Sequence, residues 1–380
     1  MKAANLIIVA YPADETLRFS TICPGASIVV VGDPKWQDSL PAVRSELQQA
    51  AGKLGARRVI YLHHLFDDVE SPHFQGLIRK LKRLKGHGRV YTHSPFDDDS
   101  FRRIVALAAA RAFGKVWVEG ATGVLRQVNV LGRKAFQQKL QIINDVYALR
   151  QRSEDDEYRI PHTALLGVEA FTPVTFAEVM HSVALTSSVI LPFPDAWGLL
   201  KSPYESERYD RSCELLAGQA APGSIGTILE VGACEGAMTA HLRKSFPDAS
   251  ICAVEPHPVF AARLRARFRK DKNVQVVQAS ILDVPLRADV IVLAEVLYYV
   301  EADQKKTLAR MRAKYLMTSC EGAFELDLCR LLSRLKWRTV ASTSVASRFE
   351  PVNGARSSLF CRREGTNIRI WKHDRSKLNG

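Results

Sequence analysis

The sequence has no apolar run that approaches the ~20 residues needed for a membrane-spanning helix. Its first apolar stretch, Leu6–Ala10, is also shorter than the apolar core of a secretory signal peptide, and Pro12 follows closely. Neither a membrane span nor a signal for export is therefore predicted. We expect a cytoplasmic protein.

Cysteine is sparse and scattered. The seven cysteines form no Cys-x-x-Cys pair, and their number is odd. A thiolate zinc site needs cysteines paired at short spacing, and a complete disulfide framework needs an even number of them. The pattern argues against both, and we expect free thiols.

Acidic residues are too few to balance the basic ones, and the formal net charge is +13. A basic chain can bind nucleic acid, but the sequence contains no recognisable RNA- or DNA-binding module. The densest basic run, Arg263–Lys270, has the spacing of one solvated face of an amphipathic helix. We expect a basic surface and no nucleic-acid partner.

The first half alternates short β-branched runs with helical patterns. Runs bounded by turn residues predict buried strands, and apolar residues at helical spacing predict helices. Gly55 is placed to end one helix, because glycine adopts the left-handed backbone of a C-cap. This βαβα order predicts a layered α/β domain with a mostly parallel sheet. The predicted strands are Leu6–Ala10, Ser27–Gly32, Arg58–Leu62 and Arg89–His93, and the helices are Pro41–Leu54, Phe74–Leu84 and Phe101–Phe113.

The periodicity breaks at Leu185–Pro203, which is rich in proline. We predict a linker there, and with it two domains at residues 1–196 and 197–380. Strand–helix alternation resumes with a helix at Tyr204–Gly218 and a strand at Thr227–Val231. The predicted fold class is α/β, with two Rossmann-like domains.

A strand, a glycine-containing turn and a helix follow one another in ILEVGACEGAMT, residues 228–239. Gly232 and Gly236 let the backbone approach a ligand, and Glu230 stands at the strand end. The next strand ends in Glu255, about 20 residues on, where a carboxylate can accept hydrogen bonds from ribose hydroxyls. Nicotinamide dinucleotide enzymes share both elements, so these do not separate hydride transfer from methyl transfer.

Two later motifs separate the two chemistries. VQVVQASILD at residues 274–283 predicts a third strand and its tip loop, and ADVIVLAEVLYYV at 288–300 predicts a fourth strand opening into a helix. This order of motifs resembles the class I methyltransferases. Together with SPYESERYD at residues 202–210, it resembles the nodulation-factor N-methyltransferase (NodS-like) family, whose members methylate an amino group on a deacetylated glucosamine residue.

The resemblance implies that S-adenosyl-L-methionine is the cofactor. In this scheme the turn holds the methionine and ribose parts, and the next strand end takes the ribose hydroxyls. Ser280 and Ile281 flank the adenine, and Glu295 lines the site near the sulfonium. The implied cofactor-binding residues are Glu230, Gly232, Gly236, Glu255, Ser280, Ile281 and Glu295.

Methyl transfer from a sulfonium needs little more than in-line positioning of a neutral amine. A base is required only to keep the amine neutral, and Glu295 and His257 are the candidates. Tyr298 is a third catalytic candidate, because a tyrosine facing the methyl group could stabilise developing charge. Tyr209, in the SPYESERYD motif, is a candidate for binding the acceptor.

The first half carries its own set of motifs over about residues 5–190, namely YPADETL, VRSELQQAAGKLGA, IYLHHLFDD and RVYTHSPFDDDSFRR. These motifs resemble the PIG-L family of zinc-dependent N-acetylglucosaminyl deacetylases. In that family a His and an Asp of the first motif bind zinc and a second Asp is the general base. Here Tyr11 replaces the His, Ala13 replaces the base, and no His occurs at residues 94–161.

One remaining ligand, Asp14, cannot hold a catalytic zinc, which needs three protein ligands. The sequence therefore predicts no metal and an inactive, pseudoenzyme-like deacetylase domain. The alternative is a site rebuilt from His63, His64 or His93. Arg44 and Asp14 are retained, so one possibility is that the domain binds a saccharide in a cleft built on them. The alternative is a scaffold or dimerisation domain, in which case the protein could be a homodimer.

The combined hypothesis is a methyltransferase that N-methylates an amino sugar or a saccharide-linked amine. Deacetylation exposes the amine that methylation modifies, so the two resemblances are chemically coherent. One alternative is an O- or N-methyltransferase of another small metabolite. The other is a non-catalytic saccharide-binding or scaffold protein. In the first two cases the partner is a small-molecule acceptor.

Overall fold

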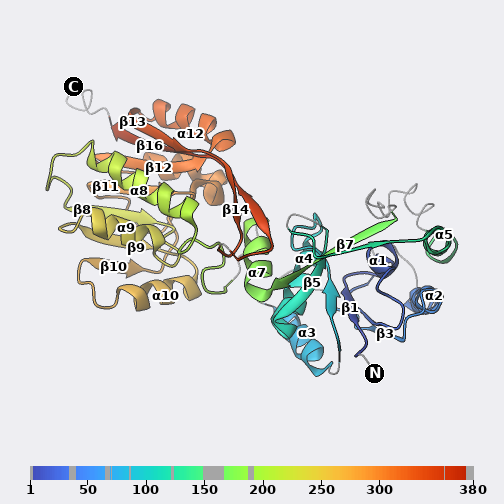
Figure 1. Cartoon of the computed structure of the whole chain (residues 1–380). Helices are drawn as coiled ribbons and strands as arrows, with labels where there is room; N and C mark the ends of the chain where they lie inside the picture. The colour runs from blue at the N-terminus through green and yellow to red at the C-terminus, as the bar shows by residue number, and fades with distance from the viewer. Residues whose placement is uncertain are drawn as a thin grey trace. The chain divides into compact units, whose positions relative to one another are not determined.

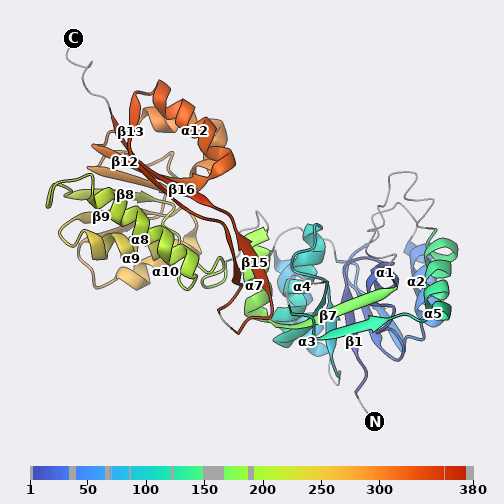
Figure 2. The same ribbon diagram turned by 45° about the horizontal axis from the view of Figure 1, so that its top comes forward.

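Two helix-covered sheets organise the chain in the computed structural model (Figures 1 and 2). The chain divides into a first unit, Met1–Leu191 with Pro351–Cys361, and a second unit, Pro192–Glu350 with Arg362–Gly380. The domain assignment predicted at residues 1–196 and 197–380 stays a prediction, because compactness does not identify a domain family. The structure describes residues 3–33, 40–64, 69, 71–84, 87–120, 124–148, 167–186, 192–354 and 356–373, with the backbone alone at 300–302 and 321–323.

The sheet of the first unit has the strand order β3-β2-β1-β4-β5-β7-β6. The first five strands in this order are parallel, and β7 and then β6 add in antiparallel orientation. The elements are β1 (Leu6–Val9), α1 (Asp14–Phe19), β2 (Ser27–Val30), α2 (Leu40–Lys53), β3 (Arg58–Tyr61), α3 (Pro72–Arg83), β4 (Val90–Thr92), α4 (Ser100–Phe113), β5 (Lys115–Glu119), β6 (Gln127–Val130), α5 (Arg133–Gln141), a π-helix (Ile142–Val146), β7 (Val168–Thr175) and α7 (Phe176–Thr186).

Both faces of this sheet are buried at its centre, as expected for parallel strands whose crossover helices cover them. Every residue of β1 and β2 is buried, so these strands are near-continuous apolar runs. Alternate side chains point to opposite faces. Ile7 and Ile28 pack with Leu17 of α1 and Leu47 of α2 in one core cluster.

The second sheet has the corresponding order β10-β9-β8-β11-β12-β16-β13. Strands β8 to β12 are parallel, and β16 is antiparallel to both of its neighbours. The elements are α8 (Pro203–Ala217), β8 (Thr227–Val231), α9 (Ala237–Ser245), β9 (Ser250–Val254), α10 (Pro258–Phe268), β10 (Val274–Val277), β11 (Val290–Ala294), a 3-10 helix (Leu297–Asp303), α11 (Gln304–Ala309), β12 (Tyr315–Glu321), α12 (Gly322–Arg334), β13 (Trp337–Val345), β14 (Arg348–Pro351), β15 (Phe360–Arg363) and β16 (Thr366–His373).

Helices cover both faces of the second sheet as well. Ile228 of β8 packs with Leu216 of α8 and Leu242 of α9 in one cluster. The next residue along the strand, Leu229, joins Leu328 of α12 in another. This alternation places α8 and α9 on one face and α12 on the other (Figure 1).

The predicted α/β alternation is confirmed in both halves. The strand at Thr227–Val231 has the predicted ends, and the next strand, Ser250–Val254, stops directly before Glu255. The helix predicted after the fourth strand of the second half is a 3-10 helix at first, Leu297–Asp303, before α11 begins. Of the predicted linker, Leu185–Pro203, the first two residues belong to α7, and residues 187–191 lie outside the described ranges.

All seven cysteines are free thiols, as predicted. Among the residues that the structure describes, no helix is long and apolar enough to cross a membrane.

Candidate functional site

The strand order of the second sheet reverses between β8 and β11. In open α/β sheets, ligands bind outside the carboxyl ends of the strands at such a reversal, because the helices diverge there and leave a crevice. Glu230 and Gly232 lie at this end of β8, and Glu295 follows β11 directly. Glu255 follows β9, the other neighbour of β8. The topology therefore brings these predicted site residues to one edge.

The turn between β8 and α9 contains three left-handed residues: Gly232 at φ 72°, Cys234 at 49° and Gly236 at 79°. A Cβ on Gly232 would collide with the Val296 side chain, and one on Gly236 would lie 2.5 Å from Leu264 Cδ1. Backbone conformation and lack of space both favour glycine here. Packing within the protein thus explains the two glycines, and their predicted contact with the cofactor stays a prediction.

Glu255 is clamped by the backbone. Its Oε2 accepts a hydrogen bond from Cys234 N at 2.8 Å, and its Oε1 accepts one from His257 N at 2.8 Å. Burial raises the pKa of this carboxyl, and the two backbone bonds act in the opposite direction. Each carboxylate oxygen can accept a further hydrogen bond, so a diol can bind without displacing either backbone donor.

Glu230 is buried behind the turn, with 2% of its surface exposed. Thr239 of α9 donates a hydrogen bond of 2.6 Å to its Oε2. Burial raises the pKa of Glu230 to about 8, so the neutral acid predominates at pH 7. Glu230 therefore ties the strand to the following helix, and its predicted role toward the cofactor stays a prediction.

Glu295 has a left-handed backbone at φ 55°, a conformation that costs a non-glycine residue about 1–3 kcal/mol. Three hydroxyls hold its carboxylate. Tyr298 donates to Oε2 at 2.9 Å, and Ser319 and Thr366 donate to Oε1 at 3.0 and 3.3 Å. The Glu295 side chain remains 22% exposed, so a ligand can reach it.

A buried cation supports this carboxylate. Arg208 Nη1 lies 3.8 Å from Glu295 Oε1 and donates to Ser319 Oγ at 2.8 Å. Two further N–H groups of Arg208 bind Glu205 Oε2, at 2.9 and 2.6 Å. Burial raises the pKa of Glu295, and the Arg208 charge opposes that rise. The site therefore holds the partly exposed carboxyl group of Glu295 beside a buried cation.

Glu205 and Arg208 lie in the SPYESERYD motif, but no role was predicted for them, and no sequence pattern pointed to Ser319 or Thr366. The Ser-x-x-Glu motif at Ser202 could have located the start of α8, because Ser202 Oγ does accept the N–H of Glu205. Ser319 and Thr366 meet Glu295 through the pairing of β12 with β16, which is long-range in sequence.

The other predicted site residues of this unit lie near the edge or behind it. His257 caps α10, its N–H binds Glu255, and its ring centroid lies 4.5 Å from that of Phe260. Ser280 Oγ accepts Leu282 N at 3.3 Å in the loop after β10, where Ile281 is buried in the core. Tyr209 is buried in the core cluster of α8 and α9, so its contact with an acceptor remains a prediction.

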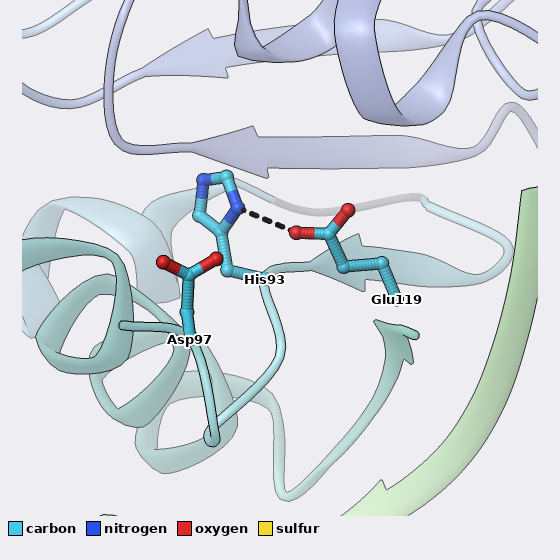
Figure 3. A group of neighbouring side chains, drawn as sticks. All are labelled: His93, Asp97 and Glu119. Atoms are coloured by element: carbon cyan, nitrogen blue, oxygen red, sulfur yellow. Dashed lines mark hydrogen bonds and ion pairs between the residues drawn. The ribbon is translucent and has the colours of Figure 1, made fainter. Parts of the chain in front are cut away.

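The first unit carries a buried ion-pair cluster at the same edge of its own sheet. His93 and Asp97 follow β4, and Glu119 ends β5 (Figure 3). One potential ligand atom from each lies within 4.8 Å of the others, a spacing that could suit a metal ion. However, Arg18 Nη1 lies 2.9 Å from Asp97 Oδ2 and 2.5 Å from Glu119 Oε1. The guanidinium supplies the positive charge that a metal would otherwise supply.

Asp14 has no exposed surface, and both of its oxygens are engaged. Arg102 donates to them at 3.2 and 2.7 Å, and Tyr11 N donates to Oδ2 at 3.1 Å. Burial alone would raise the pKa of Asp14, but Arg102 and His93 hold it below its usual range. An ion pair thus occupies the carboxylate that the sequence suggested for binding a sugar.

The structure places Arg44 elsewhere, on the exposed face of α2, where its Nη2 lies 3.0 Å from His63 Nε2. His63 Nδ1 in turn lies 2.8 Å from Asp33 Oδ1. His64 Nε2 is 2.9 Å from Lys80 Nζ. The histidines considered for a rebuilt metal site therefore lie in separate sets of contacts, and His93 belongs to the Arg18 cluster.

Residues 229–317 match the family model of a methyltransferase domain. The second unit therefore carries a methyltransferase domain, as the sequence predicted. Nodulation protein S of Sinorhizobium fredii is 32% identical over 109 residues, which cover 28% of this chain and 48% of that protein. The chain thus spans about half the length of the curated relative that it matches.

Solved structures with a similar chain include the N-methyltransferase NodS from Bradyrhizobium japonicum WM9 in complex with S-adenosyl-L-homocysteine. It is 19% identical with a TM-score of 0.38, covering 48% of this chain and 93% of that one. Magnesium protoporphyrin IX methyltransferase from Synechocystis PCC 6803, with bound S-adenosylmethionine, is 11% identical with a TM-score of 0.37, covering 45% and 80%.

Proposed function

We propose that the protein is an S-adenosylmethionine-dependent N-methyltransferase that acts on an amino sugar or a saccharide-linked amine. One observation carries the proposal. Within a methyltransferase domain, two carboxylates of different character, Glu255 and Glu295, flank the reversal point of the sheet. Glu255 is held by backbone N–H groups, and Glu295 by hydroxyls next to a buried arginine.

The residues at the glycine turn fit the cofactor. A ribose offers two neighbouring hydroxyls, and the clamped carboxylate of Glu255 has acceptor capacity left for both. When bound, S-adenosylmethionine supplies a methyl group already activated by the sulfonium. The protein itself then has to bind the cofactor and the acceptor, to orient the acceptor, and to remove one proton from the acceptor amine.

Glu295 is suited to that proton. An alkyl amine is largely protonated at neutral pH and must lose its proton before its lone pair can attack. Glu295 can accept a hydrogen bond from the ammonium group and relay its proton, while Arg208 and the three hydroxyls keep the carboxylate in place. A carboxylate is too weak a base to deprotonate an alcohol, so this geometry favours an amine over a hydroxyl acceptor.

The sugar part of the proposal has two supports. The motifs of the second half resemble N-methyltransferases of amino sugars, and those of the first half resemble deacetylases that expose such amines. We further propose that the first unit is a metal-free deacetylase-like domain. Arg18 supports this, because its guanidinium already pairs with two of the three candidate metal ligands.

The test is to incubate the full chain with S-adenosylmethionine and glucosamine oligomers that carry one free amino group. Mass spectrometry should show a gain of one CH₂ unit on the amine-bearing residue. The Glu295→Gln variant should lower the rate most at neutral pH and approach the wild-type rate at alkaline pH, where the amine is already neutral. Fully N-acetylated oligomers are the matched control substrate and should not react.

Turnover of the acetylated control, or methylation on a hydroxyl, would contradict the proposed acceptor but leave a methyltransferase. Failure to bind S-adenosyl-L-homocysteine would contradict the proposed cofactor itself.

A further inference from the structure

A groove of about 1030 Å³ lies in the first unit, where the chain enters β1 and β4. Because these strands are parallel, the groove is at their amino ends, and the Arg18 cluster lies beyond their carboxyl ends. Four segments contribute to its lining. Their polar members are Asn5 before β1, Thr21 after α1, Arg89 before β4, Tyr91 on β4, and Gln127 and Asn129 on β6.

Strand β6 keeps its polar side chains half-buried and exposes its apolar ones, the reverse of an ordinary half-buried strand. A half-buried strand normally points its apolar residues inward and its polar residues to solvent. In β6 the amides Gln127 and Asn129 are the half-buried residues, while Val128 and Val130 are 53% and 73% exposed. Such local conflicts between pattern and burial are expected at functional sites, where binding rather than stability selects the side chains.

The inward amides are joined in one hydrogen-bonded chain. Gln127 Oε1 accepts from Arg89 at 2.9 Å and from Tyr91 OH at 3.1 Å. Gln127 Nε2 donates to Asn129 Oδ1 at 3.3 Å, and Asn129 Nδ2 donates to Thr21 Oγ1 at 2.9 Å. Each amide nitrogen has two N–H donors. Among the described residues, Gln127 Nε2 and Asn129 Nδ2 each use one of them in this series of hydrogen bonds, so the second N–H can bind a ligand.

Arg89 is the one charged side chain among the described residues that line the groove. The Arg89 guanidinium stacks 4.3 Å from the Trp117 ring. The nearby carboxylate of Glu169 accepts a hydrogen bond of 2.6 Å from Thr21 Oγ1. Its charge is paired with buried Lys139, whose Nζ lies 3.2 Å from Glu169 Oε1. Fixed amides and hydroxyls, with little net charge, match a ligand that offers many neutral donors and acceptors. An anion would be bound by clustered cations instead.

We propose that this groove binds a neutral, polyhydroxylated ligand, namely a segment of a saccharide chain. The site is separate from Asp14 and Arg44, which the sequence had suggested for a sugar. The binding role is independent of methyl transfer in the second unit, so either proposal can fail without the other.

The test is calorimetric titration of the full chain with soluble oligosaccharides of glucose and of N-acetylglucosamine. At least one series should bind saturably. The Gln127→Ala/Asn129→Ala double variant should weaken binding at least about tenfold, since it removes two hydrogen-bonding side chains. Asn5→Ala, outside the Gln127–Thr21 chain of bonds, should weaken it more modestly. Gln49→Ala, an exposed amide on α2, is the matched control and should bind as wild type.

Thermal unfolding checks that each variant is folded, and Asn5→Ala keeps the test valid if the double variant is not. Equal affinity in wild type, Asn5→Ala and the double variant overturns the proposal. So does the absence of saturable binding by any oligosaccharide. Binding of an extended peptide that all variants retain would indicate strand addition at the β6 edge instead, and would equally overturn it.

Discussion

Replacing Glu255 with Ala should weaken binding of S-adenosyl-L-homocysteine about tenfold to a hundredfold. Hydrogen bonds from the ribose hydroxyls to a charged acceptor contribute about 1.5–3 kcal/mol, and each 1.4 kcal/mol is about a factor of ten in affinity. The structure adds a second effect. Glu255 also accepts the N–H groups of Cys234 and His257, at 2.8 Å each.

The Ala variant therefore leaves two backbone donors without their carboxylate, each at a cost of about 1–3 kcal/mol if water does not replace it. We expect Glu255→Ala to lower both the cofactor affinity and the unfolding free energy. Glu255→Gln keeps one carbonyl oxygen, so it should lose affinity with a smaller loss of stability. Glu214→Ala, at an exposed position of α8, is the control and should change neither.

Calorimetry at fixed salt and pH gives the affinity, and thermal unfolding of the same samples gives the stability. An Ala variant that binds S-adenosyl-L-homocysteine as tightly as wild type would refute the assignment of this strand end to the ribose. An affinity loss that disappears at low temperature, where the turn is fully folded, would show that Glu255 acts on the turn alone.

Three further perturbations test other parts of the structure. The Arg18→Ala variant should bind Co²⁺, because the substitution frees the ligand atoms of His93, Asp97 and Glu119. Binding would be seen as visible absorption and as a metal-dependent rise in Tm. A variant that stays colourless would show that the cluster cannot rearrange around a metal. Burial raises the pKa of Glu15 to about 7, whereas the same group in the unfolded chain loses its proton near pH 4.5. The folded state therefore holds the proton more tightly, and the unfolding free energy falls as the pH rises from about 4.5 through about 7. Glu15→Gln should remove that fall, and parallel Tm profiles of variant and wild type would contradict it. Gly236→Ala should destabilise the protein more than Gly223→Ala, since both have positive φ but only Gly236 has side chains where its Cβ would lie; equal losses in unfolding free energy would leave backbone strain as the whole effect.

Much of the fold was predictable because its signals are local. The strands at β8 and β9 are short apolar runs that end in an acid, and Gly55 has the left-handed φ of 71° expected of a C-cap. The antiparallel additions β6 and β7, and β13 and β16, were not predicted. Their pairing partners are distant in sequence, so no periodicity within a window reports them.

The placement of the candidate site residues was predictable to a similar depth. Glu255 and Glu295 could be placed at one edge because each directly follows a strand, and the ends of neighbouring parallel strands meet there. Their roles toward a ligand stay predictions. Arg208 lies within the SPYESERYD motif, but its contact with Glu295, more than eighty residues away, was not predicted. That contact depends on how α8 packs against the sheet, which residue spacing does not report.

The two sheets share one strand order, yet their carboxyl edges have different chemical capacities. In the first unit the carboxylates face arginines: Arg102 bonds both oxygens of Asp14, and Arg18 joins Asp97 to Glu119. An ion pair of this kind is satisfied within the protein, and a ligand could enter only by breaking it in a buried setting, where an unpaired charge costs several kcal/mol. In the second unit Glu255 is held by backbone N–H groups, which fix the carboxylate without neutralising its charge. Glu295 of the second edge also has an arginine nearby, 3.8 Å from Arg208, but 22% of its side chain stays exposed. The partners of the carboxylates, more than the shared strand order, therefore account for the different chemical character of the two edges.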